Sequence, residues 1–210
     1  IYTAGSLTMD GVTIRGMRYP VYHVGTSSAT IKNSTLVPYA NNGVTATSSS
    51  VSVTIERVSI IGPGAGTGIN IPESGGSLSM NSSAVSGFSV GVGSADQPTL
   101  FSNSFYNNTN NFSTFTNTAG YGSVGSYNVN GDPADVYSNI FLDPLFVDIG
   151  GGDYRPTSVS PLINAGAASE LDLDGRTKEG RMDRRCKPCP FVYRFRAKGR
   201  VAEHVLRDHT

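Results

Sequence analysis

Apolar and polar residues alternate in short runs through the first hundred residues, and the runs recur at a nearly constant interval. Five segments share one pattern, an alternating run, a two-residue bend and a second run: 7–14, 29–36, 53–60, 78–85 and 99–106. Their central apolar residues are spaced by 22, 24, 25 and 21 residues: Met9, Ile31, Ile55, Met80 and Phe101. Because alternation with period two is typical of a half-buried strand, each unit is predicted to contain two short strands.

The bend between the two runs has a composition that favours a sharp corner. Gly and Asn tolerate a left-handed backbone, and they hold three of the five second positions, which are Gly11, Asn33, Arg57, Ser82 and Asn103. A further alternating pair follows in most units and predicts a third strand: Val44 and Ala46, Ile69 and Ile71, Val90 and Val92.

Three short strands in each unit of 21–25 residues, stacked in parallel, predict an all-β fold: a right-handed parallel β-helix, which is a single-stranded solenoid. The five central residues would then form one interior file. A leucine-rich solenoid has a similar period, but its Leu-x-x-Leu-x-Leu framework is missing. An antiparallel sandwich would contain short strands and turns, but it would not repeat one motif in register.

Charge divides the chain in two, although the net charge of its 210 residues is zero. Residues 1–175 contain 5 Lys and Arg against 12 Asp and Glu, whereas residues 176–210 contain 11 against 4. Both cysteines and two of the three histidines also lie after residue 175. No apolar run reaches the ~18 residues that span a bilayer. The chain opens at IYTAGSL, without an initiator Met or a visible signal peptide, which indicates processing or a fragment of a longer solenoid.

Four short sequence motifs follow the solenoid region in a fixed order. They are DPLFVD at 143–148, DYRP at 153–156, SPLINAG at 160–166 and DLDG at 172–175. In these motifs and in its coils the chain resembles secreted bacterial right-handed β-helix proteins of the pectate-lyase-like superfamily, over about residues 7–183. The resemblance implies that the closing segment folds against the last coil, where it would protect open strand edges from aggregation.

The resemblance ends after Asp183, where a final strand of the family pattern is replaced by Arg-Arg-Cys-Lys-Pro. The predicted organisation is therefore 1–142 as coils and a polar loop, 143–183 as an irregular cap, and 184–210 as a basic tail. A fusion and a shifted reading frame both explain such a switch.

The tail contains a set of residues at zinc-ligand spacing: Cys186, Cys189, His204 and His209. An aromatic alternation at 191–195 suits a strand, and residues 199–209 suit a short helix. The gap before His204 is longer than in a classical finger, and the two histidines lie about 140° apart on an ideal helix. We therefore favour a basic tail that binds no metal, with nonspecific attraction to polyanions as its only nucleic-acid contact.

The coils offer three further candidate sites. Stacking would bring the charges of Asp10, Lys32 and Glu56 into one column, most simply as an exposed ion-pair network. The motif formed by Asp172 and Asp174 resembles the start of a calcium loop but lacks its later Glu. Near two arginines, Tyr19, Tyr22 and His23 form a candidate sugar-stacking patch.

The coils contain no evident catalytic carboxylate pair or metal cluster for polysaccharide cleavage. We therefore expect a secreted or cell-surface bacterial module that binds carbohydrate or mediates adhesion, with polysaccharide as partner and without catalysis in this chain. The first alternative is a fragment of a polysaccharide lyase or glycoside hydrolase whose catalytic coils lie upstream. The second is a fusion whose tail binds zinc or a polyanion.

Overall fold

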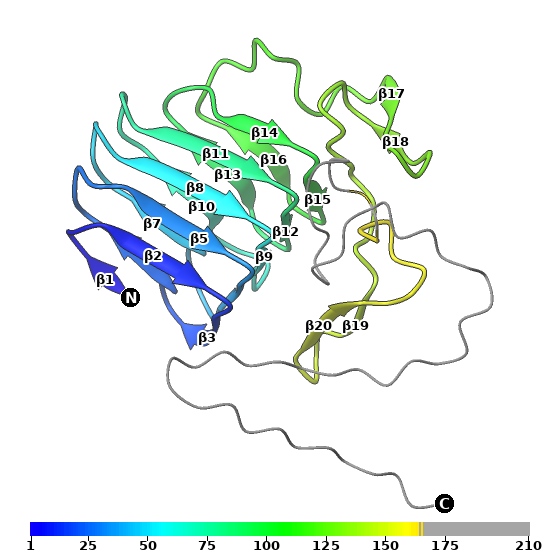
Figure 1. Ribbon diagram of the computed structural model, residues 1–210, viewed down its shortest axis with the longest axis horizontal. Coiled ribbons are helices and arrows are strands. Elements are labelled where there is room, and N and C mark those ends of the chain that lie inside the picture. Colours follow the sequence, from blue (N-terminus) through cyan, green and yellow to red (C-terminus); the bar gives the residue numbers. More distant parts are fainter. Residues whose placement is uncertain (164, 166–210) are drawn as a thin grey trace, which may run out of the picture. The chain divides into compact units, whose positions relative to one another are not determined.

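The chain winds through three parallel sheets and contributes one short strand to each sheet per coil. The computed structural model describes residues 1–163 and 165 (Figure 1). Sheet A consists, in spatial order, of β1 (Tyr2–Thr3), β4 (Val21–His23), β7 (Val44–Ala46), β10 (Thr67–Ile71), β13 (Val90–Ser94) and β16 (Asn110–Ser113). Sheet B consists of β2 (Leu7–Asp10), β5 (Ala29–Lys32), β8 (Ser52–Glu56), β11 (Ser77–Asn81) and β14 (Thr99–Phe101). Sheet C consists of β3 (Thr13–Met17), β6 (Thr35–Pro38), β9 (Ser59–Ile61), β12 (Ala84–Ser86) and β15 (Ser104–Tyr106).

Neighbouring strands within each sheet are three apart in chain order and run parallel, which confirms the predicted parallel β-solenoid, here of about five turns. The described residues contain no helix. It follows that none of them forms a helix long and apolar enough to cross a membrane.

The inward side chains form continuous files along the solenoid. In sheet B, Met9 pairs with Ile31, Ile31 with Ile55, and Ile55 with Met80, and none of the four is more than 4% exposed. Sheets A and C carry matching aliphatic files, such as Val21, Val44, Ile69 and Val92. Each coil thus buries its apolar face against the coils beside it, as the repeat predicted.

The prediction for the fifth unit was wrong by one residue. Met80 pairs with Leu100, which is fully buried, whereas Phe101 faces outward and is 40% exposed. The left-handed corner therefore falls at Ser102 rather than at Asn103. The buried amide of Asn103 explains this register, because its Nδ2 donates to the Met80 carbonyl at 3.0 Å and its Oδ1 accepts from the backbone of Ser83.

The corner between sheets B and C is left-handed in every coil. The backbone φ angles lie between 45° and 65° at Gly11, Asn33, Arg57, Ser82 and Ser102. The residue after this corner points inward and links neighbouring coils. Ser34 accepts a hydrogen bond from Val12 N, and Ser83 accepts one from Val58 N.

Residues 114–142, at the end of the region expected to hold the coils and a polar loop, cover the last coil. The hydroxyl of Tyr121 donates to the Pro98 carbonyl at 2.8 Å and accepts from Leu100 N at 3.2 Å. Ile140 bridges Ser104 of β15, while β17 (Ser126–Tyr127) and β18 (Pro133–Ala134) form a small antiparallel hairpin.

Residues 143–163 contain a second antiparallel hairpin. β19 (Phe146–Asp148) and β20 (Asp153–Pro156) pair as an antiparallel hairpin, and the hydroxyl of Ser160 donates to the Pro144 carbonyl. The ring of Tyr154 lies 5.2 Å from the guanidinium of Arg15, which belongs to β3 in the first coil. The resemblance implied a segment that folds against the last coil. Asp143 at its start does contact Tyr106 of that coil, whereas the hairpin contacts the first coil.

Candidate functional site

The three charges predicted to share a column do occupy one register on the outer face of sheet B. Asp10 pairs with Lys32, and Lys32 pairs with Glu56. The ammonium of Lys32 lies 2.5 Å from Glu56 Oε2. Asp10 instead accepts a hydrogen bond from the Asn33 amide at 2.6 Å. The column is thus one ion pair beside a separately bonded carboxylate.

Arg57 joins these groups into a single network. Its Nε donates to Asn33 Oδ1 at 2.7 Å, and its Nη1 contacts Glu56. Because Glu56 faces two cations and Asn33 links Asp10 to Arg57, the network satisfies its own charges. This is the arrangement of a structural corner, in which the side chains of Glu56 and Arg57 are only 17% and 14% exposed.

The pKa of Glu56 reflects a competition between burial and its cations. Burial raises the pKa of this carboxyl, but hydrogen bonds and charge from Lys32 and Arg57 outweigh that effect. The pKa therefore lies below the ordinary value of 4.5. A carboxyl with a lowered pKa is ionised at neutral pH, so this group is poorly suited to act as a general acid.

His23 lies apart from the tyrosines with which the sequence grouped it. It is fully buried inside the solenoid, and its Nε2 donates to the Ser27 carbonyl at 2.9 Å. The adjacent residue, Tyr22, points to the opposite face because side chains alternate along a strand. A ring in the interior cannot stack on a ligand outside the sheet, so His23 is removed from the proposed sugar-stacking patch.

Three tyrosines gather at the first coils on the outer side of sheet A. The rings of Tyr19 and Tyr22 meet edge to face at 5.4 Å. Tyr2 stacks on Tyr22 with ring centroids 5.7 Å apart and planes inclined by 8°. Tyr2 is 74% exposed, so much of its ring is open to solvent. We call Tyr2, Tyr19, Tyr22 and Arg18 the tyrosine platform.

Arg18 supplies the positive charge of the tyrosine platform. Its guanidinium lies 5.6 Å from the centroid of the Tyr19 ring. The amide oxygen of Asn41, turned toward the guanidinium, accepts hydrogen bonds from Nε at 2.5 Å and from Nη2 at 3.2 Å. These contacts hold an exposed cation beside flat aromatic surfaces. Aromatic rings stack on apolar faces of a ligand, and guanidinium groups donate to its oxygens.

Tyr2 is the platform residue that the sequence analysis missed. It belongs to β1, which pairs with β4 so that Tyr2 lies beside Tyr22. The repeat begins at residue 7, and the preceding six residues were not assigned to it. Extending the third-strand position backwards by one coil would have placed Tyr2 next to Tyr22.

The proposed metal ligands cannot be located. Cys186, Cys189, His204 and His209 lie outside the described residues, as do Asp172 and Asp174. Within residues 1–163 and 165, no group of three or more His, Cys, Asp or Glu side chains is arranged to hold a metal ion.

Comparison of the chain with protein-family models, with curated proteins and with solved structures finds no match. The architecture alone therefore defines its class, which is the parallel β-solenoids.

Proposed function

We propose that the chain is a secreted or cell-surface module that binds carbohydrate through the tyrosine platform. The observation that carries this proposal is the exposed ring of Tyr2, stacked on Tyr22 beside the cation of Arg18. An aromatic face can cover the C–H face of a sugar ring, while a guanidinium donates to hydroxyl or carboxylate oxygens. Tyr2 and Tyr22 lie on the paired strands β1 and β4, which hold such side chains more precisely than loops do, while Arg18 and Tyr19 lie in the connection between β3 and β4.

The first prediction concerns Tyr2. The proposal is tested by identifying a ligand on a glycan array and measuring its affinity for the intact chain by calorimetry. Tyr2→Ala should weaken binding about 2- to 10-fold, because a stacked aromatic contact contributes about 0.5–1.5 kcal/mol beyond its buried area. The outer ring is exposed, so the substitution should leave the fold intact.

Tyr127→Ala provides a matched control, because Tyr127 is similarly exposed at 71% but lies in the β17–β18 hairpin. The affinity of the Tyr127→Ala variant for the glycan should equal that of the unmodified chain. Equal weakening by both substitutions would contradict the platform as the binding surface, and so would an array without any bound glycan.

The proposed module is non-catalytic, and this part is tested separately. Incubation with polygalacturonate and Ca²⁺ should produce no rise in absorbance from unsaturated product. A rise would instead favour the alternative of a polysaccharide lyase. Zinc binding by the tail is a separate hypothesis. It is tested by measuring the zinc content per mole of dialysed protein.

A further inference from the structure

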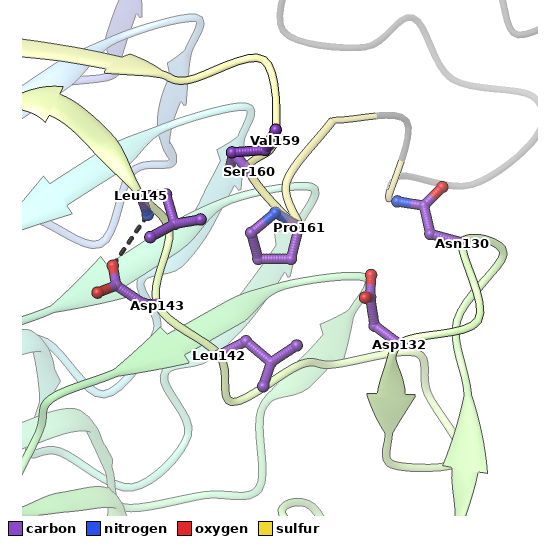
Figure 2. Close-up of a pocket in the computed structure, with 8 residues that line it drawn as sticks. All are labelled: Asn130, Asp132, Leu142, Asp143, Leu145, Val159, Ser160 and Pro161. Atoms are coloured by element: carbon purple, nitrogen blue, oxygen red, sulfur yellow. Dashed lines mark hydrogen bonds between the residues drawn. The ribbon is translucent and has the colours of Figure 1, made fainter.

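A recess lies between the loop around β18 and the turn that follows β20, apart from the tyrosine platform. Its cavity volume is about 420 Å³. Two carboxylates, Asp132 and Asp143, and the amide of Asn130 line it together with apolar side chains that include Leu142 and Pro161. Figure 2 shows Asp132 pointing toward the space beside Pro161, with Leu142 below it. Among the lining residues there is no Lys, Arg or His.

The polar groups of this recess keep free acceptors. Asp132 Oδ2 accepts from the Asn128 amide at 3.0 Å, and no hydrogen bond to Asp132 Oδ1 is found among the described residues. Asn130 donates its Nδ2 to the Ile163 carbonyl at 2.6 Å, which leaves its Oδ1 as an acceptor. Asp132 Oδ1 and Asn130 Oδ1 thus receive no hydrogen bond from the described residues, and Figure 2 shows the Asn130 oxygen turned away from Pro161.

Asp143 adds negative charge that no described cation neutralises. Its Oδ1 accepts from Leu145 N at 2.9 Å. The charge of Asp143 raises the pKa of the Tyr106 phenol, and so does the hydrogen bond that the Tyr106 hydroxyl donates to this carboxylate. The ion pairs of the described residues involve neither Asp143 nor Asp132.

We propose that this recess binds the side chain of a lysine or arginine presented by a basic peptide partner. The ammonium or guanidinium group would take the free oxygen of Asp132, and its methylene stem would cover Leu142 and Pro161. Such side chains combine an apolar stem with a charged donor end, which matches an apolar wall beside carboxylates that lack a counter-charge. This proposal is independent of the carbohydrate proposal, because it uses different residues.

The test is a titration of the intact chain with acetyl-lysine methylamide and acetyl-arginine methylamide, followed by NMR. Both probes should shift the resonances of Asn130, Asp132 and Leu142. Acetyl-norleucine methylamide has a similar stem without the charge, and it should bind about tenfold more weakly or not at all. Binding of the charged probes should weaken as salt is added.

Two substitutions test the contacts. Asp132→Asn should weaken lysine binding about tenfold, because it removes the charge while keeping the shape. Val159→Lys places a positive charge beside the recess at a lining residue that is 78% exposed, so it should weaken binding without disturbing the fold. Val159→Thr and Asp96→Asn are the controls, and both should bind as the unmodified chain does.

Equal binding of the norleucine probe would overturn the proposal, because the charge would then have no role. It would also be overturned if Val159→Lys left the affinity unchanged. Spermidine or Ca²⁺ binding at this recess in preference to the lysine and arginine probes would assign it to a free polyamine or a metal ion instead of a peptide.

Discussion

The corner residues show how single side chains shape this solenoid. Gly11 is the one corner residue without a Cβ, and the other four hold the same left-handed backbone despite having one. A left-handed conformation costs an ordinary L-residue about 1–2 kcal/mol. At Asn33 and Arg57 the side chains return part of this cost through hydrogen bonds to neighbouring coils or charges. The corner is therefore maintained by contacts between coils as well as by the local preference of Gly11 and Asn33.

Glu56 makes the stability of this corner depend on pH. Its pKa is lower in the folded chain than the ordinary 4.5, so its ion pairs stabilise the fold above that pH. This stabilisation is lost as the pH falls from about 4.5 through the folded-state pKa. Glu56→Gln should therefore lower the thermal unfolding midpoint at neutral pH, with a difference from the unmodified chain that shrinks in acid.

The measurement is a series of thermal melts followed by circular dichroism across this pH range. Glu73→Gln is the control, because Glu73 is exposed and has no ion pair in the described residues. A constant difference between Glu56→Gln and the unmodified chain at every pH would contradict the proposed role of the ion pairs.

At the scale of elements, β14 illustrates what alternation leaves open. Leu100 and Phe101 are both apolar, and a period of two permits either one to face inward. A shift of one residue moves every side chain of a strand to the opposite face. The buried amide of Asn103 decides the register, because it bonds the backbone of the coil before it and the side chain of Asn139 after it.

Substitutions in β14 separate the two registers. Leu100→Ala should lower the free energy of unfolding by about 2–5 kcal/mol, because it opens a cavity in the packed interior row of side chains from sheet B. Phe101→Ala should cost less than about 1 kcal/mol, because its ring is largely outside the core. Urea unfolding followed by circular dichroism measures both. The reverse order of the two costs would favour the register expected from the sequence.

At the scale of the whole described region, the hairpin of β19 and β20 brings a late segment of the chain into contact with the first coil. Tyr154 brings this hairpin to Arg15 in the first coil, although 139 residues separate them in the chain. The last coil is covered by residues 114–142, in which aromatic side chains such as Phe115 and Tyr121 contact the core. A solenoid with parallel strand edges needs such cover against edge-to-edge association.

The hairpin contact can be weakened without disturbing the coils. Tyr154→Ala should speed hydrogen exchange of amides in residues 146–156 about 2- to 5-fold, because an exposed cation–π contact contributes about 0.5–1 kcal/mol. Exchange within sheets A and B should remain unchanged. Arg15→Gln should have the same local effect, and Tyr127→Ala should have none. Unchanged exchange in both Tyr154→Ala and Arg15→Gln would contradict a stabilising role for the contact.

The repeat by itself determined the solenoid, its three sheets and four of its five buried central residues, because each coil obeys local alternation and turn chemistry. It also predicted Tyr19 with Tyr22 and the column of Asp10, Lys32 and Glu56, since stacking at a constant period brings equivalent positions together. Only the tertiary structure decided the register of β14, the inward position of His23 and the covering of the last coil. These depend on buried polar contacts and on packing between distant segments, which alternation along the chain does not encode.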